Sequence, residues 1–253
     1  MTEELNGQRV FFLDEGPREG EAVVLLHGWG TDHSLFRPLT DLLVRKYRVI
    51  APDFPGFGQS PEPAFPWTLD DYADHVLALL ERLGIARCIL LGHSFGGRLT
   101  IKLAARGLAA PVFPKLILVD AAGIKPAPTK RSRRRARRYR IGKKLLRPFP
   151  KLMEAYRNRH GSADYRAASP MMRQVLVKTV NEDLTPLLEK VQPPTLLIWG
   201  RNDTATPLKD GQLMQEKIPG AGLVILEDAG HYAFLEKQAQ FLRVIGSFLE
   251  IRP

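Results

Sequence analysis

The sequence predicts an α/β fold in which a mostly parallel, doubly wound sheet carries helices on both faces. Short apolar runs alternate with helical patterns from residue 22 to 120 and again from 194 to the end. Most of the runs are apolar at consecutive positions, which is typical of strands covered by helices on both sides. We expect strands at 10–13, 22–26, 47–51, 88–91, 116–119, 195–199 and 223–226.

The intervening segments have the periodicity of amphipathic helices. Between Asp70 and Leu83 the apolar residues recur three and four positions apart, and Gly84 is suited to end that helix. Further helices are expected at 95–105, 208–217 and 233–251. These helices would cover the sheet.

Residues 122–192 interrupt the alternation. They contain no convincing strand, several prolines and a helical pattern at 173–180. We therefore expect one core made of residues 1–121 and 193–253, with residues 122–192 inserted as a helical lid over the site.

Composition excludes several classes of protein. Hydrophobic residues make up 44% and charged residues 25% of the 253 positions, as in an ordinary globular chain. The single cysteine, Cys88, rules out an intramolecular disulfide and lies in an apolar run, where it is expected to be buried. The polar first residues do not resemble a signal peptide, and no apolar stretch reaches the ~20 residues of a membrane span. These features predict a cytoplasmic protein.

A candidate nucleophile lies between an expected strand and an expected helix. Gly92-His93-Ser94-Phe95-Gly96 matches Gly-x-Ser-x-Gly, the pattern of a sharp turn that exposes a serine hydroxyl at the top of a sheet. Small residues at 92 and 96 allow the strand and helix to approach each other. The alternative is that Ser94 is an ordinary helix N-cap.

A base and an acid follow later strands. His231 comes just after the last expected strand, and Asp203 comes just after the strand at 195–199. Both would lie at the carboxyl edge of the sheet, where ligands of α/β proteins bind. Asp120 also ends an expected strand and stays open as a second candidate for the acid.

Two backbone amides are candidates for an oxyanion hole. One is the N–H of Phe95, which follows the nucleophile, and the other is the N–H of Trp29 in the His27-Gly28-Trp29-Gly30 loop. Substrate-binding residues are expected at Gly28, Phe36, Tyr156, Met171, Tyr232 and Phe234.

With these motifs the chain resembles the α/β-hydrolase fold family. The resemblance extends to residues 52–60, 199–203 and 230–231 and covers nearly all of the chain outside the insertion. It implies hydrolysis of a carboxylic ester through an acyl-enzyme, with no metal or organic cofactor. A serine at position 94 argues against the haloalkane dehalogenases and epoxide hydrolases, which use aspartate there.

Other branches of the family are alternatives. The 27–30 loop lacks the glycine-rich elements of the hormone-sensitive-lipase branch and of proline iminopeptidases. Carbon–carbon bond hydrolases of meta-cleavage products share the catalytic triad of serine, aspartate and histidine, but they usually carry a Gly-Pro element that is absent here. A ligand-binding receptor that retains the triad is a third reading.

The insertion is strongly basic. Residues 125–151 hold 13 of the basic side chains and no acid, so the formal net charge of +10 leaves −3 for the remainder. The segment fits a solvated lid helix, a device that steers an anionic ester substrate, a nucleic-acid-binding patch or a membrane-surface helix. In the last case Tyr139, Leu145, Leu146 and Phe149 would supply part of an apolar face. We expect a small-molecule ester partner, anionic if steering operates, and no membrane or nucleic-acid partner.

Overall fold

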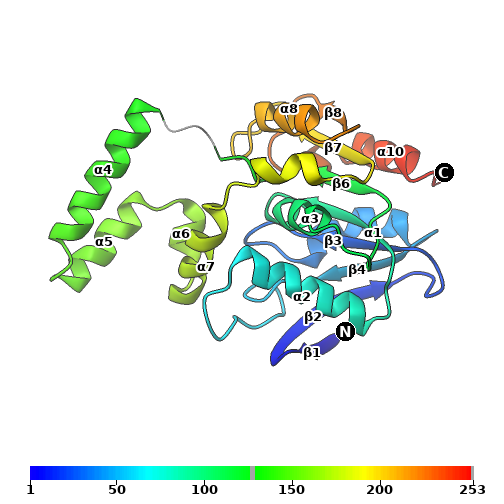
Figure 1. Cartoon of the computed structure of the whole chain (residues 1–253), viewed down its shortest axis with the longest axis horizontal. Helices are drawn as coiled ribbons and strands as arrows, with labels where there is room; N and C mark the ends of the chain where they lie inside the picture. Colours follow the sequence, from blue (N-terminus) through cyan, green and yellow to red (C-terminus); the bar gives the residue numbers. More distant parts are fainter. Residues whose placement is uncertain (126–128, 252–253) are drawn as a thin grey trace.

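The computed structural model describes residues 1–125 and 129–251, and only the backbone of residues 132 and 158. Its core is a single eight-stranded sheet in the order β1-β2-β4-β3-β5-β6-β7-β8 (Figure 1). From β4 to β8 all neighbours are parallel, whereas β1 and β2 pair antiparallel at one edge. The strands are β1 Thr2–Leu5, β2 Gln8–Glu15, β3 Ala22–Leu26, β4 Arg48–Pro52, β5 Cys88–His93, β6 Leu116–Val119, β7 Thr195–Gly200 and β8 Gly222–Leu226. The predicted doubly wound, mostly parallel sheet is confirmed.

The edge strand β1 is an addition to the prediction. Its sequence, Thr-Glu-Glu-Leu, contains no apolar run, so strand periodicity could not reveal it. The signal lies instead in Asn6-Gly7, where both residues adopt positive φ (52° and 77°) and turn the chain into a hairpin with β2. Asn-Gly between two extended segments favours this turn because both residues tolerate the left-handed region.

Helices cover both faces of the sheet because alternate strand residues point in opposite directions. The core helices are η1 His33–Phe36, α1 Arg37–Leu43, α2 Leu69–Arg82, α3 Phe95–Ala105, α8 Leu208–Lys217, α9 Ala233–Glu236 and α10 Gln238–Phe248. In β3, Val23 and Leu25 join the apolar cluster under α1 and α10, while Val24 and Leu26 join the cluster under α2, α3 and α8.

Two helix predictions need correction. Helix α1 was not predicted, and the helix expected at 233–251 is divided into α9 and α10 at Lys237, whose backbone leaves helical geometry (φ −122°, ψ 43°).

A capping box fixes the start of helix α2. The Thr68 side chain accepts from the Asp71 N–H, and the Asp71 carboxylate accepts from the Thr68 N–H.

The insertion is helical over its described residues. It contains α4 Lys130–Leu145, α5 Pro150–His160, α6 Ala163–Ala167, α7 Pro170–Val180 and the short helix η2 Thr185–Lys190. Helices α6 and α7 lie next to the core, whereas α4 and α5 extend away from it as an antiparallel pair (Figure 1). We call residues 130–160 the arm. Only the base of the insertion therefore lies near the carboxyl edge of the sheet.

Candidate active site

Ser94 occupies the turn between β5 and α3. Its backbone has φ 50° and ψ −107°, a region that residues with a Cβ rarely adopt. Hydrogen bonds fix this conformation: the Ser94 N–H donates to the carbonyl of Val119, and the Ser94 carbonyl accepts from the amides of Gly97 and Ala122. The Ser94 hydroxyl forms no N-cap bond with α3. The strained turn therefore presents the hydroxyl outward, and the N-cap alternative does not hold.

Glycines at 92 and 96 are required by close approach of the backbone. A Cβ on Gly96 would lie 1.9 Å from the carbonyl oxygen of Leu26, and one on Gly92 would lie 2.4 Å from the carbonyl oxygen of Gly96. Neither position can hold a larger residue without moving α3 away from the sheet. The two glycines of the motif thus set the height of Ser94 above β3 and β5.

Ser94, His231 and Asp203 form a continuous line of hydrogen bonds. His231 Nε2 lies 2.9 Å from Ser94 Oγ, and His231 Nδ1 lies 2.8 Å from Asp203 Oδ2. Because a carboxylate can only accept, the proton of the neutral ring belongs on Nδ1, and Nε2 is free to accept from the serine hydroxyl. The arrangement is suited to removing the proton of Ser94.

Asp203 is buried and held as an anion. Its Oδ1 accepts from the amides of Ala205 and Thr206 at 2.7 and 3.0 Å, and its Oδ2 accepts from the Thr206 hydroxyl at 2.6 Å. Burial by itself raises the pKa of Asp203, but the hydrogen bonds from His231 and Thr206 outweigh it and hold the pKa below the ordinary value. Thr206 was missed by the sequence analysis. The signal for it is a hydroxyl residue three positions after the acid.

Asp120, the other candidate acid, faces backbone rather than the imidazole. Its side chain is fully buried, and it accepts from the N–H of Gly200 at 2.8 Å and of Ala233 at 3.4 Å. Burial raises the pKa of Asp120 to about 8. Gly200 begins the loop that carries Asp203, and Ala233 follows the loop that carries His231. Asp120 therefore ties those two loops together, and the geometry favours Asp203 as the partner of His231.

The amides of Trp29 and Phe95 are both available to a ligand. Phe95 is the first residue of α3, where an N–H has no partner within the helix. Over residues 1–125 and 129–251, neither amide has a hydrogen-bond acceptor. The 27–30 loop reaches the nucleophile, since a Cβ on Gly28 would lie 3.4 Å from Cβ of Ser94. The two amides could hold an oxyanion beside Ser94.

Two buried neutral histidines support these loops. The His93 Nε2–H donates to the carbonyl of His231 at 2.9 Å, and burial lowers the pKa of His93 to about 3. The His27 Nδ1–H donates to the carbonyl of Gly28 at 2.7 Å, its Nε2 accepts from the Phe54 N–H, and burial lowers its pKa to about 4. Neither ring is placed to act as a base, because each is engaged with backbone.

A pocket of about 620 Å³ is lined by residues of the loops next to the triad, although Ser94, Asp203 and His231 are not themselves in its described lining. Its walls include Trp29 and Tyr232, the sequence neighbours of Gly28 and His231, together with Ala168 and Met172 from the base of the insertion. Among the residues predicted to bind substrate, Tyr232 therefore lines the pocket. Met172 is the pocket-facing methionine rather than the predicted Met171. The buried positions 172, 175, 176 and 179 in α7 repeat at helical spacing, which could have indicated this face.

Three other predicted pocket residues lie elsewhere. Phe36 and Phe234 are almost fully buried and pack on each other in the core, with ring centroids 5.7 Å apart. Tyr156 lies in the arm, where it stacks on Tyr139. These three side chains are not part of the described pocket lining, because Phe36 and Phe234 pack within the core and Tyr156 packs within the arm.

The charge of the pocket differs from that of the insertion as a whole. The described lining contains Asp32, Glu62 and Asp164 and no lysine or arginine. The basic helix α4 extends away from the core (Figure 1), and none of its residues is in the described pocket lining. The predicted steering of an anionic ester by residues 125–151 therefore has no geometric support.

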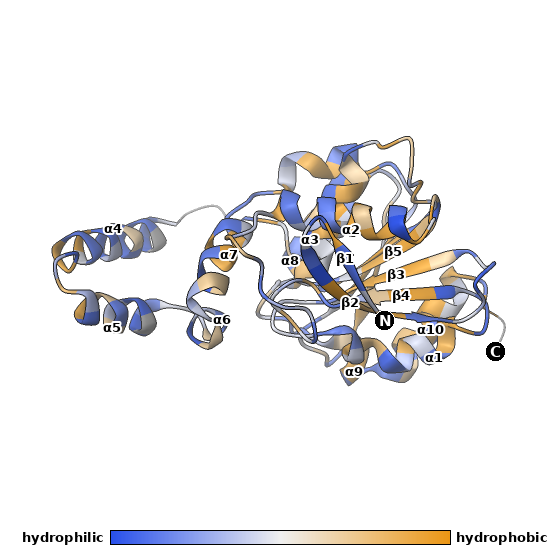
Figure 2. Ribbon diagram, turned by 90° about the horizontal axis from the view of Figure 1, so that it is seen from below, coloured by the Kyte–Doolittle hydropathy of each residue, from blue (hydrophilic) through white to orange (hydrophobic). Residues whose placement is uncertain are grey.

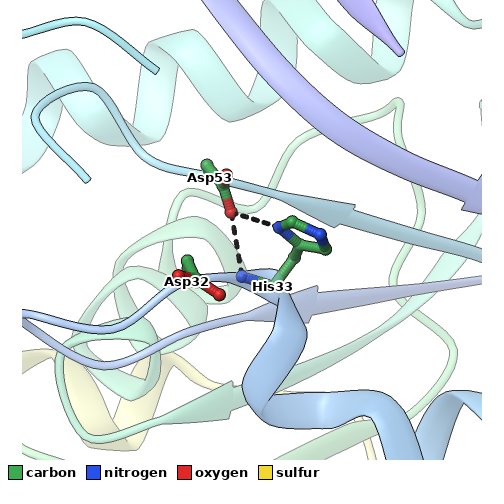
Figure 3. Close-up of side chains that lie close together, drawn as sticks. All are labelled: Asp32, His33 and Asp53. Carbon is green, nitrogen blue, oxygen red and sulfur yellow. Dashed lines mark hydrogen bonds and ion pairs between the residues drawn. The ribbon is translucent and has the colours of Figure 1, made fainter. Parts of the chain in front are cut away.

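Asp32, His33 and Asp53 lie close enough together to be considered as metal ligands (Figure 3). Their donor atoms are already engaged: Asp53 Oδ1 accepts from the backbone N–H and from Nδ1 of His33, and Asp53 Oδ2 accepts from the Gln59 N–H. Asp32 Oδ1 accepts from the amide and the hydroxyl of Ser34. The cluster fits a network that holds two loops together better than it fits a cation.

Comparison with known proteins gives the family. A model described as the alpha/beta hydrolase family matches residues 23–244. The chain belongs to this family. Its relatives include the AB hydrolase superfamily protein YisY of Bacillus subtilis, 30% identical over 95% of this chain and 96% of that protein. No helix in the described part of the chain is long and apolar enough to cross a bilayer.

Ester hydrolases are among the similar members of the alpha/beta hydrolase family. The pimeloyl-[acyl-carrier protein] methyl ester esterase of Aeromonas hydrophila is 28% identical over 91% of this chain and 96% of its own length. The structure of a thermophilic esterase from Thermogutta terrifontis superposes with a TM-score of 0.76 at 26% identity, covering 99% of this chain and 98% of that one. These findings support a hydrolase.

Proposed function

We propose that the protein is a serine hydrolase that cleaves carboxylic esters of small molecules through an acyl-enzyme. The observation that carries this proposal is the hydrogen-bonded line from Ser94 Oγ through His231 to Asp203, with distances of 2.9 and 2.8 Å. The position of Ser94 at the strained turn after β5 supports its role as the nucleophile.

The proposed reaction has two halves. In the first, His231 Nε2 takes the proton of Ser94 as Oγ attacks the ester carbonyl, and the amides of Trp29 and Phe95 bind the oxyanion. Collapse of this intermediate breaks the bond to the alkoxy oxygen, which leaves as the alcohol with the proton from His231. In the second half, water gives a proton to His231 and attacks the acyl-enzyme. Collapse of this intermediate breaks the bond to Ser94 Oγ, which takes the proton back from His231 as the acid is released.

The pocket favours esters without negative charge. Three carboxylates, Asp32, Glu62 and Asp164, lie in its lining, and Trp29, Phe57 and Met172 supply apolar surface. An anionic acyl or alcohol group would meet like charge there without a basic partner. We therefore replace the anionic substrate expected from the basic segment with a neutral, partly apolar ester.

Covalent labelling tests the proposal directly. A fluorophosphonate should react with the wild-type protein at Ser94, and Ser94→Ala should abolish labelling and lower turnover of neutral aryl esters by about 10⁵–10⁶-fold. Ser247→Ala, in α10 and remote from the triad, serves as the matched control and should keep both. Labelling of Ser94 without turnover of any ester of graded chain length would refute the enzymatic role and indicate a receptor.

A further inference from the structure

Over the described residues, the contacts that join the arm to the rest of the protein lie at its base. Tyr139 of α4 stacks on Tyr156 of α5 with ring centroids 5.4 Å apart, which holds the two helices together. Arg173 of α7 forms an ion pair with Glu154 of α5. Tyr139 and Lys143 of α4 also line a pocket together with residues of α7. From there the arm extends away from the core, and its outer end is the connection between α4 and α5 (Figure 1).

Large apolar side chains gather at this outer end. The exposed fractions are 51% for Ile141, 70% for Leu145, 56% for Phe149 and 56% for Leu152. Figure 2 shows the same concentration of hydrophobic residues where α4 turns into α5. We call these four residues the tip. An exposed apolar cluster bordered by polar residues marks a binding surface, because leaving it in water is unfavourable.

The tip lies within the most basic part of the chain. The exposed residues Lys144, Arg147 and Lys151 alternate with the tip residues along the sequence. Residues 125–151 contain no acid at all, whereas the rest of the chain has a small net negative charge. A partner of this surface must therefore offer negative charge and an apolar layer at the same place.

Nucleic acid meets only half of this requirement. Its phosphates would pair with the basic residues but would leave the tip in water, and base stacking needs accessible aromatic rings. Tyr139 is already stacked on Tyr156, and although Phe149 is exposed, the other three tip residues are aliphatic and offer no ring on which a base could stack. A bilayer that contains anionic lipid supplies both components, with negative headgroups above an apolar layer.

We propose that the arm docks the protein on an anionic membrane surface. The basic side chains bind lipid headgroups, and Ile141, Leu145, Phe149 and Leu152 insert between them. This surface differs from the face considered from sequence, because Tyr139 and Leu146 are only partly exposed whereas Ile141 and Leu152 are exposed. It replaces the expectation of no membrane partner and does not depend on the proposed esterase activity.

Co-sedimentation of the full chain with vesicles tests the proposal. We expect binding to phosphatidylcholine vesicles containing roughly one-third phosphatidylserine, little binding to phosphatidylcholine alone, and weaker binding as salt rises. Replacing Lys144, Arg147 and Lys151 by Gln should weaken binding on the order of 100-fold. Replacing Arg9, Arg45 and Lys190, three exposed residues outside the arm, by Gln removes the same charge and should change binding by less than about threefold.

The tip itself is tested by replacing its four residues with Ser. This variant should lose vesicle binding while keeping the wild-type thermal melting curve, because the tip is exposed. The control is Phe65→Ser with Val112→Ser, two exposed apolar positions of the core, which should bind as wild type does. Three outcomes would overturn the proposal: equal binding to neutral vesicles, retention on duplex DNA without vesicle binding, or self-association through the tip without vesicle binding.

Discussion

The carboxyl edge of the sheet and the arm differ in how their side chains are held by the surrounding structure. At the sheet edge Ser94, Asp203 and Asp120 are each held by hydrogen bonds to several backbone groups. In the arm, most charged and apolar side chains are exposed. Burial and hydrogen bonding fix the geometry of the first region, which suits chemistry, whereas the second region presents its side chains outward, which suits binding to a surface.

The sharpest test of this contrast at the sheet edge compares two buried aspartates. Asp203→Asn should lower kcat for a neutral ester by about 10⁴-fold, because an amide cannot hold the imidazole with its proton on Nδ1. Asp120→Asn should cost less than about tenfold, since an amide oxygen can still accept from Gly200. Steady-state kinetics on both variants measures this difference. A reversed order of the two effects would move the role of the acid to Asp120.

Two glycines test how differently the regions tolerate a methyl group. Gly96→Ala should lower the free energy of unfolding by about 3 kcal/mol or more, because its Cβ would collide with the Leu26 carbonyl. Gly142→Ala in the arm should lower it by less, since its Cβ would meet the hydroxyl and adjacent ring atoms of the Tyr156 side chain, which can move, rather than backbone. Urea denaturation of both variants gives the comparison. Equal losses would contradict the view that the arm is loosely constrained.

The sequence could predict the parts of the molecule that local pattern determines. The strands β3 to β8, the helices α3 and α8, and the positions of Ser94, Asp203 and His231 after strands follow from apolar runs, Gly-x-Ser-x-Gly and chain order. The split between α9 and α10 depends on contacts between distant segments, so periodicity alone did not give it, whereas the helical spacing in α7 could have indicated Met172 rather than Met171. No local pattern in the sequence shows that the arm extends away from the core. The lid prediction therefore placed the basic residues of the arm beside the entrance of the site.

A smaller effect concerns pH and stability. Burial raises the pKa of Asp120 to about 8 in the folded protein, above the ordinary 3.8 of the unfolded chain. Between these values the folded state holds the proton and the unfolded state does not, so the contribution of Asp120 to stability falls as pH rises from about 4 through 8. Asp120→Asn should remove this decline, which is measured as the difference in unfolding free energy at pH 5 and pH 8.5. An unchanged pH dependence would show that Asp120 titrates normally.

The smallest expected effect is that of arm charge on turnover of soluble esters. Replacing Arg133, Arg134, Arg137 and Arg138 by Gln should leave kcat/KM for both a neutral and an anionic ester within about twofold at about 0.1 M salt and above, because α4 stands away from the core and salt at this concentration screens charges over about 10 Å. A preference for the anionic ester that disappears in this variant would restore the steering hypothesis.

The central claim is that Ser94 carries the acyl group between the two halves of the reaction. Rapid mixing of the protein with an aryl ester, followed by acid quench and mass spectrometry of its peptides, measures this directly. We predict a burst of phenol release and a peptide containing Ser94 that is heavier by the acyl group, with no adduct in Ser94→Ala. Steady turnover with the acyl group on another residue, or with no acyl adduct during a burst, would contradict the account.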